Sequence, residues 1–397
     1  MQRIIGEYDN HLPGPIFVCI GGMHGNEPAG VIALQRVLAK LKAERPSIRG
    51  KFIALRGNLQ GLSTKQRYID KDLNRMWLPE RMKALENGSA TTSTTVEENE
   101  QIELYHKVHE ILDTAQDRIV VLDLHTTSSA SKPFAIFGDT IRNRNFAEYL
   151  RTPLILGLEE AIAGTLIEHI TNLGHIAIAF EAGQHDAEEA VDIHEAAVWL
   201  ALEAAGNISR NDIRFYRSYV DRITADANGL PGVLEITYRH AIRPDDTFQM
   251  EPGYVNFQRV RGGQLLARDK NGGVWSPKNY HIFMPLYQGL GDDGFFLARP
   301  INPIWLSISK SMRQLHLDTF MHYFPGVEKH PAIEHAFRVN TRIARWLVME
   351  IFHLLGYRRE RKENGVVVVS KRKYDLTAPP IQMKENGKAA RQRQLIQ

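Results

Sequence analysis

The feature that most constrains the fold is an alternation of short apolar runs with longer amphipathic stretches between residues 16 and 205. Short apolar runs are typical of buried strands, whereas amphipathic stretches with a 3.6-residue period are typical of helices. Strands that alternate with helices indicate βαβ units, so we predict an α/β domain over residues 1–206, with a mostly parallel or mixed sheet covered by helices. The expected strands are 16–21, 52–55, 119–124, 134–137, 154–156 and 175–180, and the expected helices are 28–43, 97–115, 143–149, 159–172 and 188–205.

The pattern of the chain changes after Asn207, where Gly, Pro, Asn and Asp separate short segments. Pairs such as Pro252-Gly253 and Gly262-Gly263 predict turns between short strands. We therefore expect a smaller β-rich second domain over residues 207–300.

Residues 301–397 are expected to form a helical, basic C-terminal segment. Helices are predicted over 303–357, followed by a strand at 366–369 and a frayed polar tail from 377. Nearer the N-terminus, the Ser/Thr-rich loop 87–95 has no periodicity, and the sequence leaves open whether it is a surface excursion or a lid.

Composition narrows the classes of partner. The net charge of +3, from 49 basic and 46 acidic residues, is too balanced to favour nucleic acid or a membrane surface. No apolar stretch approaches the ~20 residues needed to span a bilayer, and the N-terminus lacks the apolar core of a signal peptide, so a cytoplasmic protein is expected. The single cysteine, Cys19, allows no intrachain disulfide and is expected to be a buried core residue. The sequence leaves open whether the protein is a homo-oligomer.

Metal-binding and acid–base side chains follow three of the predicted strands. His24-Gly25-Asn26-Glu27 comes just after strand 16–21, His125 closes strand 119–124, and Glu181 closes strand 175–180. Because ligands bind outside the carboxyl ends of the strands in an open α/β sheet, we expect these side chains at one edge.

Two imidazoles and one carboxylate are a standard ligand set for catalytic zinc, which leaves a fourth position for water and lowers its pKa to about 7. His24, Glu27 and His125 provide such a set. We therefore predict one Zn²⁺ per chain, with manganese or cobalt as alternative metals. Glu181 is then free to act as general base toward water and to pass the proton to a departing amine.

Other polar residues near these motifs have more ordinary expected roles. Asp123 is expected to point to the face of its strand opposite His125, so it is not predicted to be a ligand. His175 and His185 flank the Glu181 motif and are candidates for a supporting role. His106 and His109 lie on a polar helix and are expected to face solvent.

A fourth motif, Arg67-Tyr68-Ile69-Asp70-Lys71-Asp72-Leu73-Asn74-Arg75, follows strand 52–55 and contains two arginines. The planar guanidinium suits recognition of carboxylates and of a developing oxyanion, so an anionic small-molecule substrate is expected. The alternative is a loop cross-linked by its own Asp–Arg pairs, in which Asp72 orients an arginine or His24.

The four motifs, in this order and spacing, resemble the succinylglutamate desuccinylase and aspartoacylase family of the zinc carboxypeptidase-like group. The resemblance covers residues 16 to about 205. It is carried by Gly21-Gly22-Met23-His24-Gly25-Asn26-Glu27, by the Arg67–Arg75 motif, by Asp123-Leu124-His125-Thr126-Thr127-Ser128 and by Glu181-Ala182-Gly183.

The resemblance implies an enzyme, a zinc-dependent hydrolase that cleaves the amide bond of an N-acyl amino acid or a similar small anionic amide. It also implies a smaller β domain after the catalytic one. Aspartoacylase-like members carry a further arginine about ten residues before the catalytic glutamate, where this chain has Thr171, so aspartate specificity is not expected. The roles that the resemblance implies are zinc binding by His24, Glu27 and His125, catalysis by Glu181, polarisation of the scissile carbonyl by Arg67, and binding of a substrate carboxylate by Asn74 and Arg75.

Parts of the sequence also fit three other functions. A metallocarboxypeptidase would use the same chemistry on peptides. A non-catalytic binding protein could keep the fold and interact through basic residues at 371–373 and 391–393. A dinucleotide site at Gly289–Gly294 matches G-x-G-x-x-G only formally, because residues 295–300 read as a strand and not as the required helix.

Overall fold

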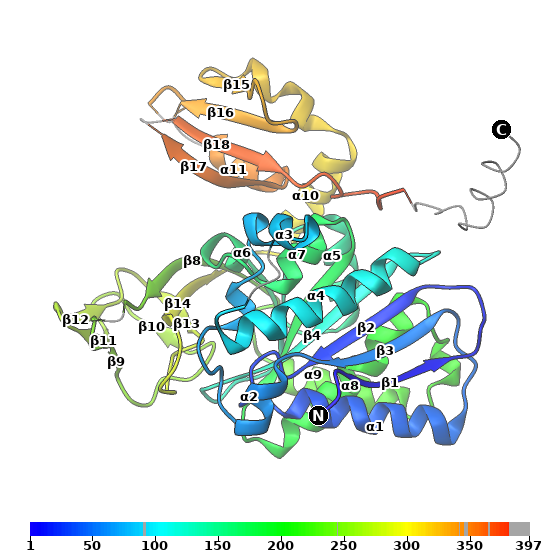
Figure 1. Ribbon diagram of the computed structural model, residues 1–397. Coiled ribbons are helices and arrows are strands. Elements are labelled where there is room, and N and C mark those ends of the chain that lie inside the picture. Colours follow the sequence, from blue (N-terminus) through cyan, green and yellow to red (C-terminus); the bar gives the residue numbers. More distant parts are fainter. Residues whose placement is uncertain (90–92, 244, 341, 345–347, 364–365, 381–397) are drawn as a thin grey trace, which may run out of the picture.

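The computed structural model describes residues 1–89, 93–243, 245–340, 342–344, 348–363 and 366–380. Within these ranges an eleven-stranded mixed sheet forms the centre of the molecule, and two smaller sheets lie beside it (Figure 1). The strand order of the large sheet is β1-β3-β2-β4-β7-β5-β6-β8-β14-β13-β10. Its strands are β1 (Ile4–Asp9), β2 (Ile16–Gly21), β3 (Lys51–Arg56), β4 (Ile119–Thr127), β5 (Phe134–Phe137), β6 (Leu154–Leu156), β7 (Ile176–Gln184), β8 (Val233–Ala241), β10 (Arg259–Val260), β13 (Tyr280–Phe283) and β14 (Asp293–Pro300).

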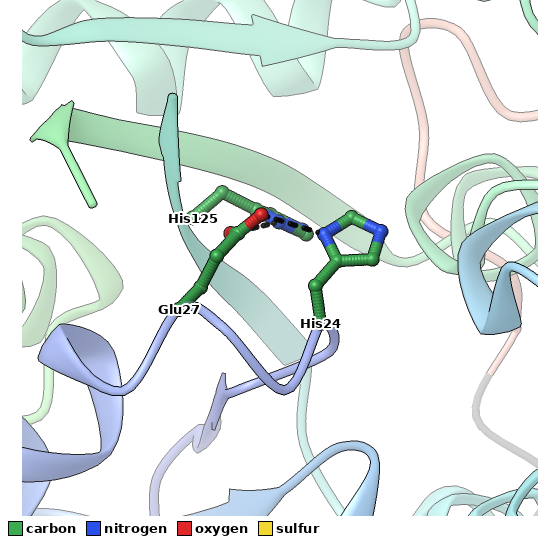
Figure 2. Close-up of side chains that lie close together, drawn as sticks. All are labelled: His24, Glu27 and His125. Carbon is green, nitrogen blue, oxygen red and sulfur yellow. Dashed lines mark hydrogen bonds and ion pairs between the residues drawn. The ribbon is translucent and has the colours of Figure 1, made fainter. Parts of the chain in front are cut away.

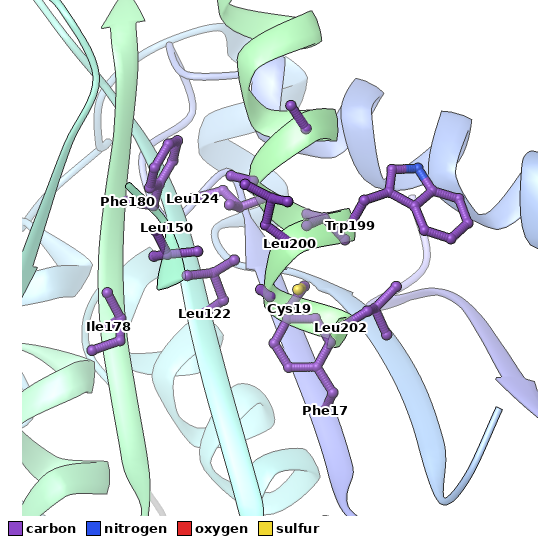
Figure 3. Packing of buried hydrophobic residues seen from close by; sticks show 14 of the residues in the cluster. Phe17, Cys19, Leu122, Leu124, Leu150, Ile178, Phe180, Trp199, Leu200 and Leu202 are labelled. Atoms are coloured by element: carbon purple, nitrogen blue, oxygen red, sulfur yellow. The ribbon is translucent and has the colours of Figure 1, made fainter. Parts of the chain in front are cut away.

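Helices cover both faces of this sheet (Figure 1). Along β2, Phe17 and Cys19 pack into one buried cluster while Val18 and Ile20 pack into the other, as the two-residue period of a strand requires. Figure 3 shows Trp199 from α8 in the first cluster with Phe17 and Cys19. The helices before residue 230 are α1 (Ala29–Glu44), α2 (Leu59–Thr64), α3 (Pro79–Glu86), α4 (Val96–Thr114), α5 (Ile141–Tyr149), α6 (Leu158–Ala161), α7 (Leu166–Asn172), α8 (Glu188–Ala205) and α9 (Tyr216–Ala227), with 3-10 turns at Leu73–Arg75 and Arg210–Asp212.

The strands and helices predicted for the α/β domain are present, except that one predicted helix is divided into two. All six predicted strands are found, and the buried Cys19 is confirmed. The helix predicted over 159–172 is two helices, α6 and α7, because Gly164 between them has a left-handed φ of 76° that a continuous helix cannot contain. The sequence did not predict β1, which pairs antiparallel with β3 at the edge.

Strands from residues 207–300 belong to two sheets. β8 pairs in parallel with β6, matching Val233 to Leu154, and β14, β13 and β10 follow it in antiparallel order, so these strands extend the large sheet. A separate three-stranded sheet contains β9 (Gln249–Met250), β11 (Leu265–Asp269) and β12 (Gly272–Trp275). The segment is β-rich as predicted, and the strand expected after Gly289–Gly294 is β14.

The C-terminal segment is not helical throughout. Its described part holds a four-stranded sheet, β15 (Val327–Lys329), β16 (Ala336–Asn340), β18 (Val366–Lys371) and β17 (Tyr357–Glu363), together with α10 (Ile304–Gln314), α11 (Val348–Leu354) and a 3-10 helix at Leu317–Tyr323. The helical prediction is wrong for 327–340, because Phe337 and Val339 point into this small core while Arg338 is exposed, which is the period of a strand. The predicted strand at 366–369 is confirmed.

Parts of two predictions lie outside the described residues. The polar loop 87–95 includes residues 90–92, and the tail predicted to fray includes 381–397. Across the described residues, no helix combines the length and the apolar character needed to span a bilayer.

Candidate metal centre and active site

His24, Glu27 and His125 converge at the carboxyl edge of the central parallel strands (Figure 2). The Glu27 carboxylate lies between the two imidazoles, with Oε1 2.8 Å from His24 Nδ1 and Oε2 3.2 Å from His125 Nδ1. All three residues are buried, and one potential ligand atom from each lies within 4.8 Å of the others. The residues predicted to bind metal are therefore brought together.

Glycine allows the loop after β2 to form this cluster. A Cβ on Gly25 would lie 1.9 Å from the backbone carbonyl carbon of Gly61, so only glycine fits between the loop and α2. The Gly25 N–H donates to the Arg67 carbonyl at 3.1 Å, and the Glu27 N–H donates to the His24 carbonyl at 3.2 Å. The compact turn brings His24 and Glu27 to one ion site.

The ring nitrogen of each imidazole that faces away from Glu27 contacts a second carboxylate. His24 Nε2 lies 3.1 Å from Asp72 Oδ1, and His125 Nε2 lies 2.8 Å from Asp123 Oδ2. The prediction that Asp123 points away from His125 is wrong, because successive side chains of a strand alternate and residues two apart share a face. Carboxylates in this position fix the tautomer and ring orientation of metal-binding histidines.

The donor set fits a divalent cation of the zinc type. Both Nδ1 atoms face Glu27, both Nε2 atoms are held by carboxylates, and one carboxylate completes the set. Burial opposes ionisation of Glu27, but His24 and His125 lower the pKa of its carboxyl well below the ordinary value. A deprotonated carboxylate is the form that binds metal.

Glu181 lies on the strand next to His125. β4 and β7 are parallel, and His125 is the Cα partner of Glu181. The Glu181 carboxyl is buried, and its Oε2 has no hydrogen-bond partner among the described residues. Burial raises the pKa of Glu181 to about 8. A carboxyl group with a raised pKa and an uncommitted oxygen is suited to taking up and releasing a proton near neutral pH.

Arg67 connects the metal cluster to a neighbouring cavity. Its Nη2 donates to Asp72 Oδ2 at 3.0 Å and its Nη1 lies 3.4 Å from Glu27 Oε1. The guanidinium also lines a cavity bordered by Arg75 and Thr126. Asp72 therefore does what the alternative interpretation expected, orienting both Arg67 and His24, while Arg67 still faces the cavity.

Asn74 and Arg75 both have protein partners. Asn74 is buried, and its Oδ1 accepts from the Leu166 N–H at 2.9 Å. Arg75 lines the cavity, where its Nη2 donates to Asp293 Oδ2 at 2.9 Å and its Nη1 donates to the Asn74 carbonyl at 2.9 Å. Arg75 therefore lines the cavity with its guanidinium paired to a carboxylate of the chain itself, whereas Asn74 holds the Leu166 backbone; their predicted binding of a substrate carboxylate stays a prediction.

The comparisons with known proteins agree with this arrangement. The model of the succinylglutamate desuccinylase/aspartoacylase catalytic domain matches residues 13–225, more than half of the 397-residue chain. The chain belongs to this family. The match includes the motifs around His24, Arg67, His125 and Glu181.

Two relatives of this desuccinylase/aspartoacylase family member carry the names of enzymes that remove acyl groups. An N-acyl-aromatic-L-amino acid amidohydrolase (carboxylate-forming) of Xenopus tropicalis is 26% identical over 63% of this chain and 83% of its own. A succinylglutamate desuccinylase of Pseudomonas fluorescens is 24% identical over 62% of this chain and 71% of its own. A succinylglutamate desuccinylase/aspartoacylase structure from Rhodobacter sphaeroides has a TM-score of 0.53 at 18% identity, covering 73% of this chain and 87% of its own, which shows the shared fold.

Two residues of the site region were missed by the sequence analysis. Glu97 of α4 is buried, and its carboxylate accepts from the N–H groups of Ile69 at 2.7 Å and Asp70 at 2.9 Å, which holds the Arg67–Arg75 loop. Gln288 lies between β13 and β14. Its Oε1 is 2.9 Å from Asn26 Nδ2 and 3.2 Å from His185 Nε2. Nothing in the local sequence distinguishes either residue from its polar neighbours.

The remaining histidine predictions have mixed outcomes. His185 lines the cavity, and its Nδ1 lies 2.8 Å from Thr126 Oγ1. His175 lines a different cavity, beside Arg142. His106 is exposed, but His109 is half-buried against Tyr105, with its Nε2 3.2 Å from that of His169, so its predicted exposure is wrong. The apolar packing of α4 against α7 turns that side of the helix inward.

Proposed function

We propose that this protein is a zinc-dependent deacylase that hydrolyses the amide bond of a small N-acyl amino acid. The observation that carries the proposal is the convergence of His24, Glu27 and His125 with Glu181 on the adjacent strand. Membership of the family supports the reaction class, as do the names of two relatives, an N-acyl-aromatic-L-amino acid amidohydrolase and a succinylglutamate desuccinylase.

His24, Glu27 and His125 would hold the metal ion, and Asp72 and Asp123 would keep the imidazoles in the required orientation. When bound, a divalent ion supplies Lewis-acid chemistry, which polarises a carbonyl oxygen and lowers the pKa of water. Zinc is proposed because two imidazoles and one carboxylate are its usual catalytic ligands.

Glu181 is assigned the proton transfers. Its carboxylate takes a proton from the attacking water and delivers it to the nitrogen of the leaving amine, so that the amide C–N bond breaks as the amine becomes neutral. Burial and the unpaired Oε2 suit this group to both steps. The pairing of β4 with β7 sets Glu181 beside His125, next to the residues that would hold the metal ion.

Arg67 is assigned to the scissile carbonyl oxygen, where negative charge develops in the tetrahedral transition state. Its guanidinium is fixed in place by Asp72 and borders the cavity next to the metal cluster. Arg75 lines the same cavity and Asn74 positions it through a backbone contact, so we assign both to substrate binding.

The test is a substrate screen on zinc-loaded protein, with N-acyl amino acids of varied acyl group and side chain set against short peptides with a free C-terminus. We expect hydrolysis of N-acyl amino acids and none by the Glu181→Gln variant. Turnover of peptides alone would instead establish a metallocarboxypeptidase. Absence of turnover with every compound, despite bound zinc, would favour the non-catalytic binding protein.

The non-catalytic reading relied in part on basic residues 371–373 as an interaction surface. Arg372 is not available for that role, because it is buried and its guanidinium pairs with the Glu159 carboxylate at 2.9 and 3.0 Å. Residues 391–393 lie outside the described part of the chain.

A further inference from the structure

The Asp293 carboxylate pairs with the guanidinium of Arg75, the residue to which the family resemblance assigns a substrate carboxylate. Its Oδ2 accepts from Arg75 Nη2 at 2.9 Å, and its Oδ1 accepts from Arg239 Nε at 2.5 Å. The Asp293 side chain is only 13% exposed. Asp293 opens β14 and lies 218 residues from Arg75 in the chain.

The pairing with Asp293 leaves Arg75 with few N–H groups that could bind a substrate. Its Nη2 is bound to Asp293, its Nη1 donates to the Asn74 carbonyl, and its Nε is buried without a partner. A substrate carboxylate that bound the remaining Nη hydrogens of Arg75 would lie beside Asp293, which would bring two carboxylates together in a largely buried place. Like charges in such a place are costly, so Asp293 opposes an anionic group there.

The apolar part of the cavity lining agrees with an uncharged occupant. It consists of Ile162, Met284, Leu286 and Phe296, whereas the polar lining residues besides Arg75 and Asp293 are Arg67, Thr126, Thr127, Ser128, His185, Gln288 and Asp292. Apolar side chains bind an apolar group because its surface is removed from water. They form no hydrogen bonds that would compensate a carboxylate for its lost hydration.

We propose that Asp293 is a specificity-determining residue, whose carboxylate pairs with Arg75 and keeps a substrate carboxylate away from it, so that the portion of the substrate beside Arg75 is uncharged and apolar. The inference rests on the proposed deacylase function and narrows it to N-acyl amino acids that carry no carboxylate at this position. It replaces the expectation of an anionic group bound by Asn74 and Arg75.

The test uses matched substrates that differ only in carboxylate against carboxamide. One pair is an N-succinyl and an N-succinamoyl amino acid, which varies the end of the acyl group; the other is N-acetylglutamate and N-acetylglutamine, which varies the side chain. For the zinc-loaded wild-type protein, we expect kcat/KM for the carboxamide to equal or exceed that for the carboxylate in both pairs.

Asp293→Asn should release Arg75 for an anion. We expect the carboxylate-to-carboxamide ratio of kcat/KM to rise about tenfold or more in one pair, the size of a charge-assisted hydrogen bond. Adding Arg75→Gln to this variant should return the ratio to the wild-type value. The matched control is Asp292→Asn, which removes a charge from the exposed neighbouring residue and should change the ratio by less than about fivefold.

Several results would overturn the inference while leaving the deacylase function intact. These are a wild-type preference for a carboxylate by about tenfold, an unchanged ratio in Asp293→Asn, or an equal change in Asp292→Asn. The wild-type preference needs no variant, so it decides the question even if Asp293→Asn does not fold. Wild-type protein that binds zinc but hydrolyses neither pair nor the wider screen would instead overturn the proposed function, and this inference with it.

Discussion

Glu181 differs from the three metal-binding candidates in its surroundings. His24, Glu27 and His125 contact one another, whereas the Oε2 atom of Glu181 is buried without a hydrogen-bond partner among the described residues. The first three are placed to hold an ion and the fourth to exchange a proton. Substitutions at these residues should therefore have separable effects on metal content and on rate.

Glu181→Gln should keep its zinc and lose at least about a hundredfold in kcat, because the amide cannot accept a proton. His24→Ala should lose the zinc itself, since one ligand of three is removed. Metal analysis of the purified proteins and steady-state kinetics would measure both effects. His175→Gln is the control, because His175 lines another cavity, and it should match wild type in both measurements.

Asp123→Asn should weaken zinc binding by about 10–100-fold, because the charge that orients and polarises His125 is lost. Competition with a chromophoric chelator would measure the affinity. Asp226→Asn serves as the control, since the described residues pair the half-buried Asp226 with Lys132 at 3.2 Å. Equal affinities in the two variants would contradict the assigned role of Asp123.

At the scale of elements, the loop between β2 and α1 is shaped by close backbone contact. Gly25 approaches Gly61 of α2 so closely that a Cβ would lie 1.9 Å from the carbonyl carbon. Gly25 follows His24 directly and its N–H donates to the Arg67 carbonyl, so a shift of Gly25 would disturb both neighbours. The fit of this loop therefore determines the geometry of the metal ligands.

Gly25→Ala should destabilise the fold by about 1–3 kcal/mol or more, because the added methyl overpacks the loop. It should also weaken zinc binding. Urea denaturation and metal analysis would detect the two effects. Gly232→Ala is the control, since a Cβ at Gly232 would meet nothing within 4 Å. If the two variants were equally stable, the close approach at Gly25 would not be a constraint.

At the scale of the whole molecule, a buried ion network joins the C-terminal sheet and its helices to the large sheet. Arg313 of α10 is fully buried, and its guanidinium binds Asp139, which follows β5, at 2.7 Å and Asp375 at 3.0 Å. Burial opposes ionisation of Asp139, but Arg144 and Arg313 lower the pKa of its carboxyl below the ordinary value.

Arg313→Met should reduce the free energy of unfolding by about 3–5 kcal/mol at pH 7, because it removes a buried guanidinium from two carboxylates, Asp139, which keeps Arg144, and Asp375. A lowered carboxyl pKa stabilises the fold above the ordinary pKa of about 4, and this contribution is lost as pH falls through the folded value. The difference between wild type and variant should therefore shrink below about pH 4. Urea denaturation at pH 7 and pH 3 would measure it, and an unchanged difference would contradict the pairing.

Local patterns of the sequence determined the core of the fold and the metal-binding set. Apolar runs marked every strand of the parallel centre, because burial on both faces demands continuous apolar residues. The position of His24, His125 and Glu181 just past or at the ends of such strands was enough to place them at one edge.

Only the tertiary structure decided which residues meet across long stretches of chain. The pairing of Arg75 with Asp293, the return of β8 and β14 to the large sheet, and the burial of Arg372 against Glu159 all join segments far apart in sequence. Periodicity reports which face of an element is buried, whereas the partner of a polar side chain depends on how distant elements pack. The family and its hydrolase class could therefore be predicted from the sequence, but the pairing of Arg75 with Asp293 beside the candidate site could not.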